Sequence, residues 1–425
     1  RLGTLLLDPK NITIANISVF DTSPILIGDD YDSASGSHFG AGGDAFLDND
    51  DGLFGFSVSL ITAADGTPRL AVGGPQVETT GDNSGAVFLY TFTDTSFGGA
   101  ALASTMGKGY GSSPNVDVND HTGWWLDDND QFGVSVSLAK NPDGKMRLAV
   151  GARNADGVGN AKSKSGEVYL FTFSDGSFSG GDFAGTIGFN VGSLAGNNID
   201  LGDGTNVSGT DGVDDEFVKL KTEDQFGDSV SLSIAEDGTT RLAVGAIGAD
   251  GDDENTGSSG EVYLFTFNND NHVDGEFSGG DLEAIIGKDY DDASVRDGKD
   301  IDMDLAANDY FGFGVSLYYD EAASAHRLAV AASSADGSGD PGGDPDNTGD
   351  VYLYTFTDSS FGGGLHVGSI GWGYTGSKDI DLQLDEDSGP VTDVALDGNY
   401  LAVGVGEGTG NGSLSESGEV YLFSY

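Results

Sequence analysis

The chain contains no cysteine, and basic side chains are scarce among its 425 residues. The absence of cysteine excludes disulfide bonds, thiolate metal sites and cysteine nucleophiles. Lysine and arginine number 18 against 70 acidic residues, which gives a formal charge of −52. Because nucleic acid and anionic membranes both require a basic face, we expect neither as a partner, whereas divalent cations would be attracted.

Long hydrophobic runs are missing as well. The longest apolar segments, such as GEVYLFTF from Gly166, are much shorter than the roughly 20 residues of a membrane-spanning helix, so we expect no membrane insertion. The chain begins at Arg1 rather than methionine, and the lack of cysteine is typical of many bacterial secreted proteins. We therefore expect a secreted or cell-surface protein that is a processed product or the C-terminal part of a longer one.

Histidine is rare and scattered. The five histidines share no motif and no common spacing, so neither a zinc site nor a histidine base is indicated. They are His38, His121, His272, His326 and His366.

The chain is instead rich in internal repeats. A first segment, FGFSVSL in its first copy, starts at Phe54, Phe132, Phe226 and Phe311, with a degenerate copy, GPVTDVAL, at Gly389. A second segment of the type RLAVGA starts at Arg69, Arg147, Arg241, Arg327 and, as YLAVGV, at Tyr400. A third segment of the type EVYLFTF starts at Ala86, Glu167, Glu261, Asp350 and Glu419.

These segments are short, rich in Val, Leu, Phe and Tyr, and bounded by Gly and Asp, which predicts β-strands. The joints between the first two segments carry Asp-Gly, a pair that favours tight hairpins, so the strands are antiparallel. A fourth segment ending in glycine follows at Ala103, Ala184, Glu283 and Val367. The last repeat lacks one, but PILIG from Pro24 precedes the first repeat.

Five copies of each of the four strand segments predict an all-β fold, a five-bladed β-propeller of four-stranded antiparallel blades. We expect the N-terminal strand, Ile25–Ile27, to complete the last blade beside Val420–Phe423 and so close the ring. Residues 1–19 would form a lead-in and 20–425 a single propeller. The blades are predicted at approximately 54–107, 132–188, 226–287, 311–371, and 389–425 together with 24–28.

The ordered set DQFGVSVSL, RLAVGA and GEVYLFTF resembles the FG-GAP repeat of integrin α-subunit propellers and their bacterial relatives. Two departures matter. Integrin propellers have more blades than the five repeats found here, and their calcium loop, D-x-D-x-D-G in the first hairpin, is replaced by loops such as AEDGTT and NPDGKM. The calcium sites of the family are therefore not carried over. A second segment, TLLLDPKNITI from Thr4, resembles the end of the shaft in filamentous-haemagglutinin-like exoproteins of bacterial two-partner secretion, which implies a head on a secreted fibre.

Carboxylates concentrate in the long loop before each Phe-Gly. Clustered aspartates in Gly-rich loops can supply the six to eight oxygen ligands that calcium takes. Four of them stand two residues before the Phe or its equivalent, and three alternate along one segment. The alternative is that the acids only solvate the surface. The candidate Ca²⁺ ligands are Asp48, Asp50, Asp127, Asp130, Asp224, Asp300, Asp302, Asp304, Asp309 and Asp387.

The loops between the second and third strands repeat Ala-Asp-Gly, with Asp156, Asp250 and Asp336 in register. In integrin-like propellers this loop lies on the ligand-facing surface, so the resemblance implies ligand-binding roles for these aspartates. The alternative is a turn in which each Asp accepts hydrogen bonds from its own loop. The arginines of the second segments repeat with the blade, which favours a structural role for them.

Two classes of function remain. One is an extracellular binding or adhesion module, supported by calcium, that recognises a protein or glycan through its loop face. The alternative is a glycoside hydrolase or lyase that uses carboxylates in the propeller channel, which requires unlike acids on inward strands of particular blades. The first strands mostly read Ser-Val-Ser-Leu, and Asp228 and Asp393 are the acids that interrupt them. We expect the binding module and no enzyme activity.

Overall fold

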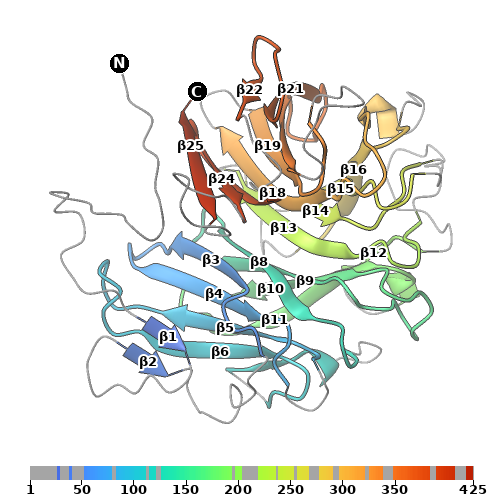
Figure 1. The fold of residues 1–425 in the computed structure, drawn as a ribbon. Helices are drawn as coiled ribbons and strands as arrows, with labels where there is room; N and C mark the ends of the chain where they lie inside the picture. The colour runs from blue at the N-terminus through green and yellow to red at the C-terminus, as the bar shows by residue number, and fades with distance from the viewer. Residues whose placement is uncertain are drawn as a thin grey trace, which may run out of the picture. The chain divides into compact units, whose positions relative to one another are not determined.

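A computed structural model of the chain describes most of its strands (Figure 1). No helix in the described part is long and apolar enough to span a membrane. The described residues are 26–28, 38–40, 52–78, 83–111, 114–120, 126–193, 197–202, 219–235, 238–252, 256–267, 277–290, 296–320, 325–337, 348–382, 389–406 and 418–424.

The chain divides into two compact units, which are described separately. The N-terminal unit comprises Asn16–Arg241 and Phe267–Asp281, and the C-terminal unit comprises the remainder. In the N-terminal unit one sheet has the order β3–β4–β5–β6–β7, formed by Ser57–Thr62, Pro68–Gly74, Ala86–Thr91, Ala101–Gly107 and Val116–Asp117. The next has the order β8–β9–β10–β11–β12, formed by Phe132–Lys140, Met146–Ala152, Glu167–Phe173, Asp182–Gly188 and Ile199–Asp200.

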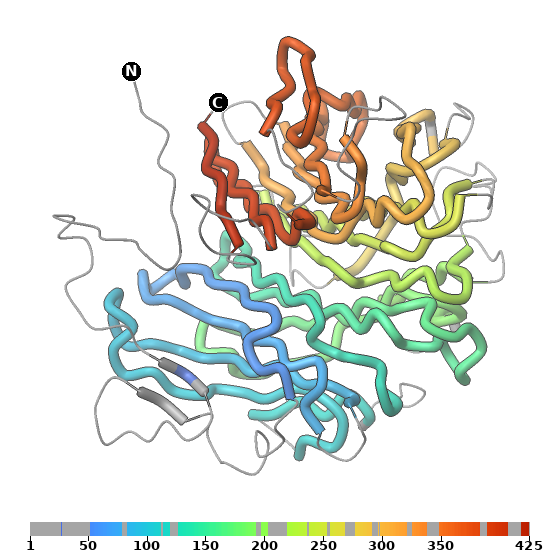
Figure 2. Tube along the Cα trace, viewed as in Figure 1, coloured from blue at the N-terminus to red at the C-terminus, as the bar shows by residue number. Residues whose placement is uncertain are grey.

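Three further sheets follow along the chain, as the backbone trace shows (Figure 2). The first of these sheets has the strand order β13–β14–β15–β16–β17 and comprises Phe226–Ile234, Thr240–Ala246, Glu261–Phe267, Gly280–Gly287 and Ile301–Asp302. The order β18–β19–β20–β21–β22 is formed by Phe311–Asp320, Ala325–Ala332, Asp350–Phe356, Leu365–Gly371 and Ile380–Asp381. The order β23–β24–β25 is formed by Val391–Asp397, Tyr400–Val405 and Glu419–Ser424. Three single-turn 3₁₀ helices lie at Val118–Asp120, Val191–Ser193 and Arg296–Gly298.

The five repeated sheets confirm the five-bladed β-propeller. The hairpins form at the Asp-Gly joints, where Gly66 and Gly144 have φ of 83° and 82°, a conformation that glycine adopts without strain. Four blades nevertheless have five strands rather than four. After the glycine that ends the fourth strand, a two-residue strand pairs with it in parallel, as in Gly188 opposite Asp200.

The strand that we expected to close the ring has a different partner in the structure. Leu26–Gly28 forms β1, which pairs in parallel with β2, His38–Gly40. The sheet that holds β25 has three strands and ends with it. Among the described residues, Leu26 and Ile27 pair with β2 and not with β25, so the predicted pairing of Ile25–Ile27 with Val420–Phe423 is not found there; Ile25 itself lies outside the described residues.

The core of the N-terminal unit lies between adjacent blades. Phe132, at the start of β8, is fully buried in a cluster that also holds Leu89 and Met106 of the preceding sheet. Its ring meets those of Tyr169 and Phe171 edge to face, with centroids 5.4 and 6.2 Å apart. The repeated Phe thus acts as a packing residue between sheets, as its repetition predicts.

Serines of the first strands connect neighbouring blades. In the N-terminal unit Ser135 Oγ donates to the Gly227 carbonyl at 2.8 Å, and the Leu232 amide donates to Ser137 Oγ at 2.9 Å. Ser57 and Ser59 make the same two bonds one blade earlier. The Ser-Val-Ser-Leu repeat therefore encodes the contact between innermost strands.

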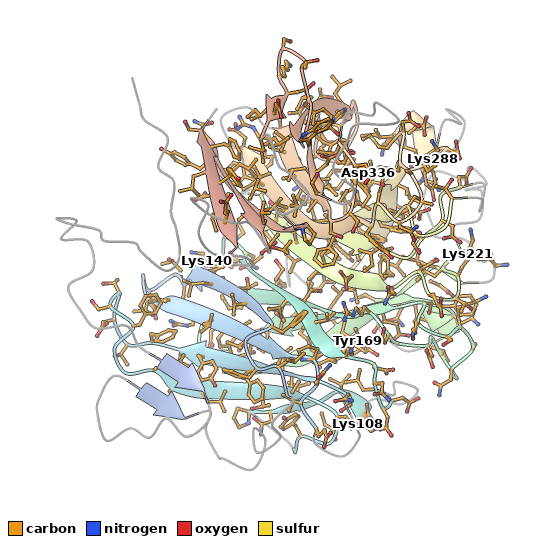
Figure 3. The ribbon with its side chains drawn as sticks, viewed as in Figure 1. Lys108, Lys140, Tyr169, Lys221, Lys288 and Asp336 are labelled. Carbon is orange, nitrogen blue, oxygen red and sulfur yellow. The ribbon has the colours of Figure 1, made fainter. Side chains whose placement is uncertain are left out.

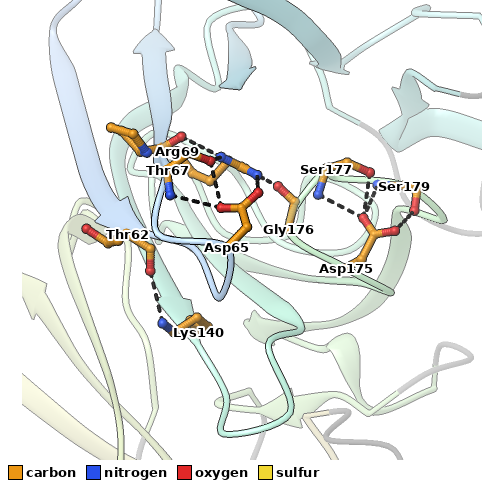
Figure 4. A network of polar contacts seen from close by, with 10 residues as sticks. Thr62, Asp65, Thr67, Arg69, Lys140, Asp175, Gly176, Ser177 and Ser179 are labelled. Atoms are coloured by element: carbon orange, nitrogen blue, oxygen red, sulfur yellow. Dashed lines mark hydrogen bonds and ion pairs between the residues drawn. The ribbon is translucent and has the colours of Figure 1, made fainter. Parts of the chain in front are cut away.

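The arginines of the second segments have structural partners. Arg69 donates from Nε to the Gly176 carbonyl, in the loop after β10, and from Nη2 to Asp65 Oδ2 at 2.9 Å (Figure 4). Asp65 also accepts from the amide and hydroxyl of Thr67, and these hydrogen bonds lower the pKa of Asp65 to about 2. The hairpin of one blade is thereby held to a loop of the next.

Candidate functional site

Three of the predicted metal ligands perform one repeated structural task. Asp130 Oδ2 accepts the Asp127 amide at 2.7 Å, Asp224 Oδ2 accepts the Lys221 amide at 2.6 Å, and Asp309 Oδ2 accepts the Ala306 amide at 2.8 Å. Each aspartate is buried and closes the tight turn that leads into Phe-Gly. Their spacing before the Phe is thus explained by the turn, without requiring an ion.

A second set of buried carboxyl groups stands at the start of the third strands and was not anticipated. Tyr169 Oη donates to Glu167 Oε2 at 2.6 Å, and Tyr263 makes the same bond to Glu261 at 2.6 Å. The signal was present in the sequence, because the third segments repeat an acidic residue, Val and Tyr. These side chains lie two residues apart on a strand, so they share one face.

Burial makes several of these acids hard to ionise. Desolvation, aided by the nearby Glu167, Asp127 and Asp156, raises the pKa of Asp130 to about 8. Desolvation also raises the pKa of Glu167 to about 7, against the hydrogen bond from Tyr169. These acids recur at equivalent positions in successive blades, which is the behaviour of structural residues rather than of one catalytic centre.

The Ala-Asp-Gly aspartates bind the ends of their own loops. Asp156 Oδ1 accepts the Lys164 amide and Asp250 Oδ1 accepts the Ser258 amide, both at 2.7 Å. Asp336 occupies the same position after β19 and is exposed; it is labelled in Figure 3. A ligand-binding role for the three aspartates stays a prediction, whereas their turn role is visible for two of them.

The alternating aspartates before the fourth blade each have partners of their own. Asp300 Oδ1 accepts the Ile285 amide at 2.7 Å, and its other oxygen pairs with Arg296. Asp302 accepts the Asp289 amide at 2.8 Å, and Asp304 pairs with Lys288 at 2.8 Å. Backbone amides and basic side chains thus occupy the oxygens that the sequence suggested for an ion.

No group of three or more acidic or histidine side chains within the described ranges is arranged to hold a metal ion. Asp48, Asp50 and Asp387 lie outside those ranges. Calcium binding by the acidic loops therefore stays a prediction.

Two residues that depart from the repeat, Arg153 and Asp228, contact each other in the N-terminal unit. Asp228 stands on β13 where the preceding blade has Val134, and Arg153 follows β9 where the next repeat has Ile247. Arg153 Nη1 lies 2.8 Å from Asp228 Oδ1, and the two side chains are 27% and 5% exposed. Each of the two charged residues thus stands where a neighbouring repeat has an apolar one.

Neighbouring groups orient this pair. Arg153 Nε donates to Gln131 Oε1 at 2.8 Å, so the guanidinium is held from two sides. Burial raises the pKa of Asp228, and the Arg153 guanidinium opposes that rise by favouring the carboxylate. Because the Arg153 side chain is about a quarter exposed, the pair is accessible from solvent on that side. Perturbed acids beside a fixed cation are typical of functional sites.

Asp393, the other acid on a first strand, belongs to the C-terminal unit. Burial raises its pKa, and its Oδ1 accepts the Val394 amide at 2.8 Å. Ser316 Oγ of the preceding blade accepts the Leu396 amide on the same strand at 2.9 Å. Asp393 is thus a second acid that the repeat does not require, although its side chain, unlike that of Asp228, is exposed.

Comparison with known proteins supports the propeller. A family model described as FG-GAP repeat matches residues 127–171 and 220–265, so the chain carries FG-GAP repeats. No curated protein sequence matches the chain. The match covers two of the repeats that the sequence analysis identified.

Several solved structures with a similar fold are glycoside hydrolases. A thermostable family-43 glycoside hydrolase is 12% identical, with a TM-score of 0.41 over 88% of this chain and 89% of that one. A GH93 α-L-arabinofuranosidase of Fusarium graminearum is 10% identical, with a TM-score of 0.42 over 90% and 96%. An α-L-arabinanase of Penicillium chrysogenum is 10% identical, with a TM-score of 0.40 over 87% and 92%. At these values the likeness concerns the fold.

These neighbours correct the expected function. We expected an adhesion or binding module without enzyme activity, whereas the named solved structures on the same propeller fold are enzymes that act on glycosides.

Proposed function

We propose that the protein is a glycoside hydrolase in which the carboxyl group of Asp228 takes part in the reaction. The observation that supports this proposal is the Arg153–Asp228 pair, 2.8 Å apart and absent from the equivalent positions of the sister repeats. The equivalent positions of the other Phe-Gly repeats hold apolar residues, Phe56, Val134 and Phe313. A buried acid at a single blade therefore requires another explanation, and catalysis by a positioned carboxyl group supplies one.

Hydrolysis of a glycosidic bond needs two carboxyl groups. One donates a proton to the departing glycosidic oxygen as its bond to the anomeric carbon breaks, and the other acts as base toward water or as nucleophile toward that carbon. Arg153 favours the ionised form of Asp228, which suits the base or nucleophile. In this role Arg153 and Gln131 are positioning residues that keep the carboxylate in one orientation.

The test is turnover of a panel of neutral and acidic oligosaccharides, with products separated by chromatography. Asp228→Asn is expected to lower kcat by a factor of about 10³ or more, since it retains the shape but cannot ionise. Asp393→Asn is assayed alongside it. Glu167→Gln serves as the matched control, because Glu167 is a buried acid of the repeated type and its replacement should leave kcat within about twofold.

The outcome separates the possible chemistries. Hydrolysis adds water and gives two saturated sugars, whereas a lyase leaves an unsaturated sugar that absorbs in the ultraviolet. Absence of turnover on the whole panel, or full activity of Asp228→Asn, would overturn the proposal.

Three earlier expectations remain proposals alongside this one. Calcium binding is tested by titration of the metal followed by thermal unfolding, with an Asp300/Asp302/Asp304 triple replacement as control; an unchanged melting temperature would remove it. Secretion is tested by locating the protein in cell fractions. The expectation that the protein is the head of a secreted fibre depends on the segment from Thr4, which lies outside the described residues.

A further inference from the structure

The C-terminal unit contains a β-strand with one unpaired edge. In the sheet β23–β24–β25, the strand β25 pairs with β24 along its whole length, and no strand within the described ranges pairs with its other edge (Figure 1). The corresponding third strands of the other blades, β5, β10, β15 and β20, each lie between two strands. The outward N–H and C=O groups of β25 can therefore pair with a further strand.

The exposed side chains of β25 are apolar. Val420 and Leu422 are 42% and 49% exposed, whereas the equivalent Val262 and Leu264 of β15 in the same unit are fully buried. Natural proteins usually protect a strand edge that carries exposed apolar side chains, because such an edge is a template for pairing with another chain. The edge of β25 has the properties of a docking site for an added strand.

The other blades show which sequence pairs with a third strand of this type. The strand β11 runs antiparallel to β10 and places Gly185, Thr186, Ile187 and Gly188 opposite Leu170, Tyr169, Val168 and Glu167. Beside β5 and β20 the same positions read Ser-Thr-Met-Gly and Gly-Ser-Ile-Gly. Because β25 repeats the sequence Glu-Val-Tyr-Leu of β10, it fits a partner of the same pattern.

The last glycine of this pattern is required by the acid opposite it. A Cβ added at Gly188 would lie 2.8 Å from Glu167 Cγ, and the hydrogen bond from Tyr169 restrains the Glu167 side chain. The acid of β25 is held in the same way, because Tyr421 Oη donates to Glu419 Oε2 at 2.5 Å. A strand added to β25 therefore needs glycine opposite Glu419.

We propose that β25 binds an extended segment of a partner polypeptide as an added antiparallel strand, with a sequence of the type Gly-Thr-Ile-Gly. Main-chain hydrogen bonds supply the affinity, while the contact of Ile with Val420 and the fit of glycine against Glu419 supply the specificity. Among the described residues the chain's own β1 pairs with β2 and not with this edge. The edge belongs to the C-terminal unit and Asp228 to the N-terminal unit, so this inference does not depend on the proposed function.

The experiment measures binding of a fluorescent synthetic peptide with the sequence of residues 182–189, DFAGTIGF. Fluorescence anisotropy with the full chain is expected to show saturable binding in the micromolar range. A peptide with valine in place of the residue that corresponds to Gly188 should bind roughly tenfold or more weakly. The Val420→Lys protein should lose a similar factor, because a charge replaces the apolar contact with Ile. Leu365→Lys, the same kind of change at a residue of β21 that is 60% exposed, is the matched control and should bind as the wild type does.

Each outcome decides the inference. Absence of saturable binding would overturn it, and this is the result expected if another segment of the chain fills the edge. Equal binding by the wild type and Val420→Lys, or equal binding of the glycine and valine peptides, would assign the binding to another place and overturn it as well. Binding that is lost in Val420→Lys and retained in Leu365→Lys would support it, whether or not the protein hydrolyses a glycoside. Circular dichroism of each variant verifies that the fold is retained.

Discussion

Arg153 and Asp228 lie 2.8 Å apart, and both depart from the repeat that surrounds them. Ile247 stands at the position of Arg153 one repeat later, and Val134 stands at the position of Asp228 one repeat earlier, so each charged residue replaces an apolar one. A buried ion pair seldom stabilises a protein more than well-packed apolar residues of similar size do. Stability alone therefore gives little reason for this pair.

The first prediction concerns replacement of Arg153 and Asp228 by the apolar residues that neighbouring repeats carry at these positions. Arg153→Ile alone leaves Asp228 buried without its cation and should lower the free energy of unfolding by roughly 2 kcal/mol. This is less than the roughly 3–5 kcal/mol of a fully buried pair, because Arg153 is partly exposed. The double variant Arg153→Ile/Asp228→Val should recover to within about 1 kcal/mol of wild type. Urea unfolding measures both, and a double variant no more stable than the single one would contradict the argument.

The second prediction concerns Glu167 and pH. Its pKa is raised from 4.5 to about 7 in the folded protein, chiefly by desolvation. Between these values the unfolded chain loses the proton while the folded one keeps it, so the contribution to stability is complete below about pH 4.5 and is lost as pH rises toward 7. The loss is roughly 3 kcal/mol.

Glu167→Gln cannot ionise and should flatten this dependence, while its amide oxygen still accepts from Tyr169. Exposed Glu223→Gln is the control. Denaturant unfolding at several pH values tests the prediction, and parallel curves for wild type and Glu167→Gln would refute it.

The third prediction concerns the serine contacts between blades. Ser137→Ala removes the acceptor of the Leu232 amide, which lies in a partly buried contact. The unpaired amide should cost about 1–3 kcal/mol. Ser163→Ala, at an exposed loop position, should change stability by less than about 0.5 kcal/mol. Equal stabilities of the two variants in thermal unfolding would count against the serine contact.

The fourth prediction concerns the close approach of β9 and β13 at Gly151 and Gly227. A Cβ added at Gly151 would lie 1.9 Å from the Gly227 carbonyl oxygen. Gly151→Ala must therefore push β9 and β13 apart, and we expect a loss of about 1–3 kcal/mol or more. Gly111→Ala meets no atom within 4 Å and is the matched control. A melting temperature unchanged by Gly151→Ala would show that the strands separate freely.

The strands were predictable because repetition multiplies a weak local signal. One copy of RLAVGA is a short apolar run, but five copies in fixed order exclude other folds. The fifth strands were missed because two residues carry almost no pattern, although Ile-Asp recurs at Ile199, Ile301 and Ile380 and pairs with the preceding fourth strand each time. The pairing of β1 with β2 was missed for the same reason, since β2 is only three residues long.

The candidate site was predictable only in part. Asp228 and Asp393 were identified as acids that interrupt the first strands, but the importance of Arg153 was not, because it stands 75 residues before its partner. The metal candidates were chosen by acidic density. Asp130 and Asp309 instead accept backbone amides three residues earlier in their turns.

The sequence by itself determined the number of blades, the order of their strands and the positions of their hairpins. These depend on local propensity and on repetition, which are both written along the chain. Only the tertiary structure decided which acids close turns, which have a raised pKa, and which pair with arginines. Those properties depend on burial and on partners distant in the chain, and a linear pattern specifies neither.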